Sequence, residues 1–103
     1  MRKKRSDRNH VVYRVQLADT GDSYIGVTVA LGSAYLRSVK VRVQKHFSRA
    51  KVEDKNWAFC EAIRAYPDGD WRYEVLEVVR GRKPAHQRER ELTKKLRATL
   101  NEF

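Results

Sequence analysis

The chain has 103 residues, the usual length of a single compact domain. It carries 23 Lys and Arg against 13 Asp and Glu, a formal charge of +10 at pH 7, and 41% of its residues are hydrophobic. No apolar run reaches the length of a membrane span, and none follows the basic start, so we expect neither a membrane protein nor a secretory signal. Because Cys60 is the single cysteine, a disulfide framework and a thiolate zinc site are excluded.

The positive charge is concentrated in three blocks. Residues 1–8 carry five bases and one acid, residues 37–51 carry six bases and no acid, and residues 80–97 carry eight bases and two acids. Residues 52–79 reverse this balance, with three bases and seven acids. Such blocks predict a positive face, for which a nucleic-acid backbone is the commonest partner; a merely solvated basic surface is the alternative. We expect a flexible basic tail over residues 1–8 and one domain over 9–103.

The first predicted elements form a β-hairpin. Residues 10–17 and 23–29 are rich in β-branched and aromatic side chains, which is typical of strands. Residues 19–22, Asp-Thr-Gly-Asp, have the chemistry of a turn. Gly26 interrupts the second strand and indicates either a bulge or the close approach of another group to the backbone.

Two helices follow the hairpin. Residues 38–50 show a helical pattern with Ser38 as a candidate N-cap, and residues 31–36 are compatible with a loop or with an earlier helix start. Residues 57–66 form the second predicted helix. The apolar face of the first helix consists of Val39, Val43, Phe47 and Ala50.

A third strand and a last helix complete the chain. Residues 71–79 alternate well enough for a strand, and residues 85–97 form a helix with Pro84 at its start. The order strand, strand, helix, helix, strand, helix predicts an α+β fold, a small three-stranded antiparallel sheet flanked by helices. The core side of the last helix consists of Leu92, Leu96 and Leu100.

Five polar or aromatic residues stand out from this framework. Glu89 lies on the leucine stripe of the last helix, where a carboxylate costs several kcal/mol unless a cation meets it. Arg42 and His46, four residues apart, share a face of the first helix. Tyr13 and Tyr24 lie on the two arms of the hairpin. Each observation also has an ordinary explanation: a Glu–Arg pair, a basic surface helix and a cross-strand aromatic pair.

In combination, these residues resemble the GIY-YIG nuclease family. Val11-Val12-Tyr13 stands where the family has Gly-Ile-Tyr, and Tyr24-Ile25-Gly26 matches the second motif. The two tyrosines are eleven positions apart, within the usual spacing of the family. The resemblance covers residues 10–101. Val11 replaces the first glycine, a position that contributes backbone rather than chemistry.

Two helical motifs extend the resemblance. The segment from Arg42 to His46 is similar to the Arg-x-x-x-His motif of phage homing-type members, and Glu89 with Asn101 twelve positions later is similar to the final helix of the family. The stretch between the second tyrosine motif and Arg42 is longer than usual. Because of this longer stretch, Arg37 is an alternative candidate for the catalytic arginine, although the spacing between Arg42 and His46 favours Arg42.

The resemblance implies a metal-dependent endonuclease that hydrolyses DNA phosphodiesters with low intrinsic sequence specificity. Glu89 would hold one Mg²⁺, which Mn²⁺ can replace. Arg42 would neutralise the scissile phosphate, and Tyr24 would orient water or phosphate. A proton from the attacking water would pass to Tyr13, whose pKa must then be lowered, or to His46.

The resemblance also implies structural residues and partners. Gly26 and Asn101 are expected to support the site rather than to react. The expected partner is DNA, without a membrane, for a monomer or weak homodimer. Phosphate contacts are expected from basic side chains of the first and last helices, namely Arg37, Lys40, Lys45, Arg49, Arg88 and Lys94.

The biological role is left open at this point. Homing, repair, restriction and degradation of host DNA are all compatible with a compact stand-alone nuclease. We expect a cytoplasmic, nucleoid-associated protein, and a phage-infected host cell is favoured because such compact members are frequent in phages. The main alternative is a catalytically inactive nucleic-acid-binding module with the same fold. Composition alone also fits a small ribosome-associated protein.

Overall fold

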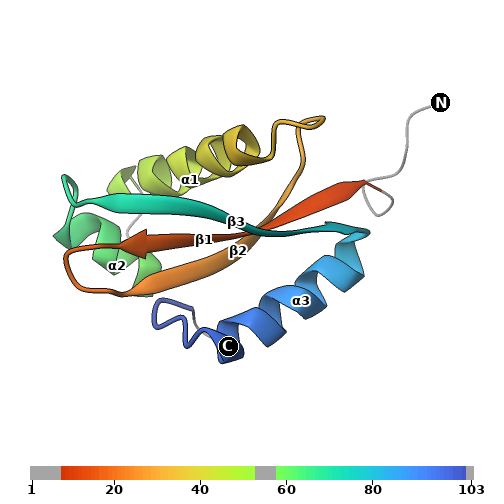
Figure 1. The fold of residues 1–103 in the computed structure, drawn as a ribbon. Helices are drawn as coiled ribbons and strands as arrows, with labels where there is room; N and C mark the ends of the chain where they lie inside the picture. Colours follow the sequence, from red (N-terminus) through yellow and green to blue (C-terminus); the bar gives the residue numbers. More distant parts are fainter. Residues whose placement is uncertain (1–7, 53–57, 102–103) are drawn as a thin grey trace.

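The β-branched segment near the start of the chain forms the central strand of a three-stranded sheet. In the computed structural model, which describes residues 8–52 and 58–101 apart from the side chains of 49–52, the strand order is β2-β1-β3 and both pairings are antiparallel. Figure 1 shows the sheet between two helical layers, with α1 over one face and α3 over the other. The elements are β1 (Asn9–Leu17), β2 (Ser23–Val29), α1 (Tyr35–Val52), α2 (Ala58–Ala65), β3 (Trp71–Arg80) and α3 (Arg82–Lys95).

The predicted fold class is confirmed. The structure is α+β, with the elements in the predicted order β-β-α-α-β-α. The strand bounds agree with the sequence pattern to within one residue. The predicted tail, apart from Arg8, lies outside the described residues, as do Trp57 and the side chain of Arg49.

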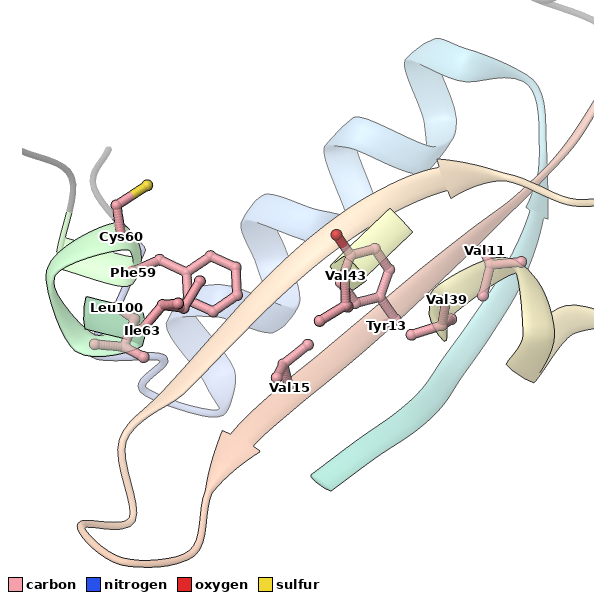
Figure 2. Close-up of a cluster of buried hydrophobic side chains, with 9 residues drawn as sticks. All are labelled: Val11, Tyr13, Val15, Val39, Val43, Phe59, Cys60, Ile63 and Leu100. Atoms are coloured by element: carbon pink, nitrogen blue, oxygen red, sulfur yellow. The ribbon is translucent and has the colours of Figure 1, made fainter. Parts of the chain in front are cut away.

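Alternation along β1 supplies two cores, one on each face of the sheet. Val11, Tyr13 and Val15 point to the face covered by α1 and α2, where they pack with Val43 and Phe59 (Figure 2). On the other face, β1 and β2 contribute a smaller cluster that packs against Leu92 and Leu96 around α3. Since both faces of β1 are covered, nearly the whole strand is buried, unlike a strand with one face in water.

A bulge in β3 lies directly beside Tyr13. Val12 pairs with Glu77 and Tyr13 pairs with Val75, so Leu76 is the extra residue in β3. Leu76 packs into the cluster beneath α3, and Glu77 forms an ion pair with α3. The bulge therefore turns the consecutive side chains of Leu76 and Glu77 towards α3. Beyond the bulge, the side chains of β3 again alternate between the two faces of the sheet.

The first helix begins earlier than the sequence pattern indicates. The structure starts α1 at Tyr35, so the expected N-cap Ser38 lies inside the helix. Its hydroxyl donates to the carbonyl of Ala34 and accepts from the amide of Leu31, both at 2.8 Å. The prediction of Ser38 as N-cap is wrong, because its hydroxyl back-bonds within the first turn and ties the preceding loop to the helix.

The last helix is displaced towards the N-terminus relative to the prediction. It runs from Arg82 to Lys95 and ends before Leu96. Leu100 is therefore not on the helix, although it is 92% buried. The chain passes round the edge of β2, where the amide of Leu100 donates to the carbonyl of Ser23 at 2.9 Å, and Leu100 joins the core on the α1 side. Of the three leucines predicted on the core side of this helix, only Leu92 lies on it, while Leu96 follows its last residue and still packs against the core.

The edge strand β2 is closed by Asn101. Its side-chain oxygen accepts from the amide of Ile25, and its side-chain nitrogen donates to the carbonyl of Ile25, both at 2.7 Å. The amide thus pairs with β2 as another strand would, which protects an otherwise open sheet edge. The segment after α3 is fixed against β2 at this point.

Gly26 is required by the ring of Tyr13, its direct cross-strand partner. A Cβ atom at Gly26 would lie 2.5 Å from the Tyr13 hydroxyl oxygen, 2.6 Å from Cζ of the same ring and 2.9 Å from the Tyr24 ring. Of the two explanations for this glycine, the structure confirms the close approach, because the β1–β2 register is continuous and contains no bulge.

We expect Gly26→Ala to destabilise the fold by about 1–3 kcal/mol, the usual cost of overpacking. The reason is that the added methyl group would overlap the Tyr13 ring, which is fully buried among core side chains. The measurement is urea unfolding, with Thr28→Ala on the same strand as the control. A gain in stability of about 0.5–1 kcal/mol, as expected from replacing a strand glycine alone, would contradict this account.

Candidate active site

The candidate site is centred on the Tyr13 hydroxyl. The ring projects from β1 towards β2 (Figure 2) and crosses Gly26. Arg42, half-buried on α1, lies near enough to the Tyr13 hydroxyl for its positive charge to lower the pKa of that group. A guanidinium and a phenol from different elements therefore meet over β2.

Tyr24 connects this pair to an aromatic cluster. Its ring is stacked on Phe59 of α2, with ring centroids 4.2 Å apart and planes 10° apart. His46 of α1 meets Tyr24 edge-on at 5.8 Å and Phe59 at 5.4 Å, and Tyr13 lies 6.4 Å from Tyr24. The two tyrosines and the histidine are thus held by ring packing, which fixes their orientation before any ligand binds.

Glu89 reaches the cluster from α3. Its side chain is 13% exposed, and one carboxylate oxygen lies 3.6 Å from Nδ1 of His86, three residues earlier on the same helix. Burial raises the pKa of Glu89, while His86 and Arg90 act in the opposite direction. Of the carboxylates in the described part of the chain, Glu89 is the one whose charge raises the pKa of both Tyr13 and Tyr24. The carboxylate is therefore electrostatically coupled to both phenols.

Both phenols are held neutral at physiological pH. Burial raises the pKa of Tyr13 well above its usual range, Tyr24 and Glu89 add to this rise, and Arg42 opposes it with a smaller effect. Burial and the charge of Glu89 raise the pKa of Tyr24 to about 12, against the opposing effect of Arg42. The protein alone therefore presents two hydroxyl groups that act as hydrogen-bond donors, and neither is a ready proton acceptor.

The donor set for a divalent cation is sparse. Within residues 8–52 and 58–101, no three His, Cys, Asp or Glu side chains gather as metal ligands would. Glu89 supplies a largely buried carboxylate whose pKa is raised by burial, against the opposing effects of His86 and Arg90. Mg²⁺ often takes one or two protein carboxylates and completes its shell with water and phosphate oxygens. The residues present meet this minimum but do not form a closed protein cage.

The structure separates the two arginines that competed for the site. Both lie in α1, about 140° apart around the helix axis at 3.6 residues per turn. Arg42 lowers the pKa of Tyr13, whereas Arg37 is exposed and is not among the groups that act on either phenol. Lys40 and Lys45 are also exposed on α1. These three exposed bases remain available to an external ligand.

The expected phosphate contacts on α3 divide into two groups. Lys94 is exposed, whereas Arg88 is held by carboxylates on both sides. Nε of Arg88 lies 2.7 Å from Glu77 of β3, and its guanidinium also pairs with Glu91 one turn along α3. Arg88 therefore anchors α3 to the bulge of β3, and we remove it from the group of ligand-binding residues.

Sequence reasoning missed His86 and Arg90. His86 contacts the Glu89 carboxylate, and Arg90 lowers the pKa of that group. A signal for His86 is present in the sequence, because residues three apart on a helix are neighbours. Arg90 lies next to Glu89 in the chain, so its effect on the carboxylate becomes evident only with the side chains in place.

Comparison with known proteins finds no matching family model, no matching curated protein and no matching solved structure. None of the helices in the described part of the chain has the length and apolar character needed to cross a bilayer. The feature of this chain that bears on function is therefore the cluster of Tyr13, Tyr24, Arg42, His46 and Glu89.

The raised pKa of Tyr24 predicts a loss of stability in alkali. Above pH 10 the unfolded chain releases the phenolic proton while the folded protein retains it, so the free energy of unfolding falls as pH rises. From the pKa of about 12 in the fold, this group alone costs about 1 kcal/mol between pH 8 and 11. Urea unfolding at the two pH values should show a smaller loss for Tyr24→Phe than for the unsubstituted protein. An identical loss of unfolding free energy in the two proteins would contradict this prediction.

Proposed function

We propose that this protein is a divalent-metal-dependent endonuclease with a GIY-YIG-like site that hydrolyses DNA phosphodiesters. One observation carries the proposal: side chains from both hairpin strands, α1 and α3 meet in a single electrostatically coupled cluster. That cluster contains a guanidinium, two phenols, an imidazole and a carboxylate. Hydrolysis of a phosphodiester needs groups that neutralise the phosphate, orient water, bind a cation and accept a proton.

The charge balance of the cluster supports a phosphate as the reacting group. Arg42 is positioned beside a neutral phenol, so its guanidinium can neutralise charge that develops on phosphate oxygens. Tyr13 and Tyr24, both protonated, can donate hydrogen bonds to a phosphate oxygen or orient a water molecule. Glu89 would hold Mg²⁺ or Mn²⁺, which supplies Lewis-acid activation of water and charge stabilisation when it is bound.

In this proposal, His46 accepts the proton from the attacking water. Sequence reasoning left Tyr13 and His46 as alternatives, and a general base works best when its pKa lies near the working pH. Since burial raises the pKa of Tyr13, the phenol is the poorer acceptor. His46 packs edge-on against Tyr24, which brings an imidazole to the same cluster. Tyr13 then acts as a positioning group for water or phosphate.

DNA is the proposed substrate, with low intrinsic sequence specificity. The charge of +10 favours a polyanion, and exposed bases on α1 and α3 favour phosphate contacts, which carry no sequence information directly. The same proposal includes a phage homing-type or DNA-processing role. It also includes an oligomeric state of monomer or weak homodimer.

A second candidate, an inactive binding module, is favoured by one observation. Tyr13 has no exposed surface, so a substrate must displace part of the surrounding structure to reach its hydroxyl. The two candidates share the fold and the basic surface and differ in whether the cluster reacts. The two substitutions below separate them.

Glu89→Gln is expected to abolish nicking of supercoiled plasmid in Mg²⁺ while the fold and the affinity for DNA are retained. The amide has the shape of the carboxylate but cannot neutralise a cation. The control is Glu61→Gln, which removes the same charge from the exposed face of α2. Nicking at the normal rate by purified Glu89→Gln would overturn the metal-site assignment, and absence of nicking by the unsubstituted protein would favour the inactive module.

Arg42→Ala should lower the single-turnover rate of cleavage by two or more powers of ten, the order expected for one lost charge-stabilising group. Arg37→Ala should weaken binding and leave the rate at saturating protein nearly unchanged, because Arg37 is exposed about 140° round α1 from Arg42 and does not act on the phenols. Both variants are compared at fixed Mg²⁺. An inactive Arg37→Ala together with an active Arg42→Ala would show that the wrong arginine has been assigned.

A further inference from the structure

A stripe of exposed bases runs along the outer side of α3, beside the candidate active site. Four of its five members, from Lys83 to Lys94, recur about once per helical turn, and an open groove of about 690 Å³ follows the stripe. The residues that form this basic stripe are Arg82, Lys83, His86, Arg90 and Lys94. From Arg82 to Lys94 the stripe spans about 18 Å at 1.5 Å per residue. Measured along the axis of a DNA duplex, that length corresponds to about five phosphates of one strand.

The acidic residues of α3 leave most of the stripe uncompensated, since, in the described part of the chain, His86 is the one member that an ion pair joins to a carboxylate of this helix. Glu91 is paired with Arg88, which also binds Glu77 and lies outside the stripe. Glu89 is paired with His86, and its charge also acts on the two phenols. Within the described residues, no ion pair joins Arg82, Lys83, Arg90 or Lys94 to a carboxylate. The positive charge of this face is therefore available to an external anion.

The stripe adjoins the active-site cluster through two residues. His86 contacts the Glu89 carboxylate, and Arg90 lowers the pKa of that group, so both bases lie beside it. From there the stripe extends one turn towards each end of the helix. A strand bound along α3 would consequently pass Glu89 with phosphates on both sides of it.

We propose that the basic stripe of α3 is a docking surface for the phosphate backbone of duplex DNA, which it guides past Glu89. The identity of the ligand rests on the proposed function, whereas the contact itself requires no hydrolysis. Regularly spaced bases on a rigid helix fit a backbone with regularly spaced charges. The expected binding is insensitive to sequence and strongly dependent on salt.

Lys94→Gln and Lys95→Gln form a matched pair for the test. The two lysines are adjacent, exposed and equal in charge, but Lys95 is rotated about 100° away and does not line the groove. Binding of a fluorescent 20-base-pair duplex is measured by anisotropy in EDTA over a range of salt concentrations. Lys94→Gln should reduce the slope of log K against log salt by about 0.9, and Lys95→Gln should leave it unchanged.

The double variant Arg90→Gln/Lys94→Gln extends the test. It should reduce the slope by about 1.8, which corresponds to roughly thirtyfold weaker binding at 0.15 M salt if the electrostatic contribution vanishes at 1 M. Circular dichroism verifies that each variant is folded. Equal effects of Lys94→Gln and Lys95→Gln would overturn the docking surface, because affinity would then follow net charge alone. Equally tight, Lys94-dependent binding of single-stranded DNA would overturn the assignment to a duplex.

The docking surface and the proposed function can fail separately. Normal nicking by Arg90→Gln/Lys94→Gln, with an unchanged salt slope, would overturn the docking surface and leave the nuclease proposal intact. A stripe-dependent slope in a protein that never nicks DNA would overturn hydrolysis and leave the docking surface intact.

Discussion

The contact of Tyr13 with Gly26 is the constraint on which the rest of the site depends. The ring can cross β2 only because its cross-strand partner has no Cβ, and this crossing carries the hydroxyl from the central strand to the neighbourhood of Arg42 and the charge of Glu89. A side chain at position 26 would force the ring aside and separate these groups. A packing requirement inside the sheet thereby determines the geometry of a polar cluster beside it.

Helices on opposite faces of the sheet contribute to one cluster because β2 is an edge strand. Arg42 and His46 approach from the α1 side, and Glu89 approaches from the α3 side. The side chain of Asn101 occupies the edge of β2 itself through its two hydrogen bonds to Ile25. Arg88 anchors α3 to β3 and compensates two carboxylates, which leaves the outer side of the helix basic. Different residues of α3 thus support the cluster and expose positive charge.

The sequence predicts the elements and their order correctly because each apolar pattern is local and strong. The ends of the helices are less predictable: Ser38 back-bonds inside α1 instead of capping it, and Leu100 is buried beyond the end of α3 through a tertiary contact with Ser23. Motif spacing selects Tyr13, Tyr24 and His46, which the fold does bring together, and Arg42, whose charge acts on both tyrosines. The choice of Arg42 over Arg37 as the catalytic arginine stays a prediction. It could not predict the raised pKa of Tyr13, which arises from burial in the finished core, nor the two ion pairs of Arg88.

The most direct test of the central claim is to locate a bound duplex on the protein. A short DNA duplex is titrated into ¹⁵N-labelled protein in EDTA, and the Nε–H resonance of Arg42 and the amide of Gly26 are followed by NMR. If the cluster around Tyr13 receives a phosphate, both resonances shift with the same saturable dependence on DNA concentration. If both stay in place while resonances elsewhere saturate, the duplex binds away from the cluster, and the assignment of an active site there is contradicted.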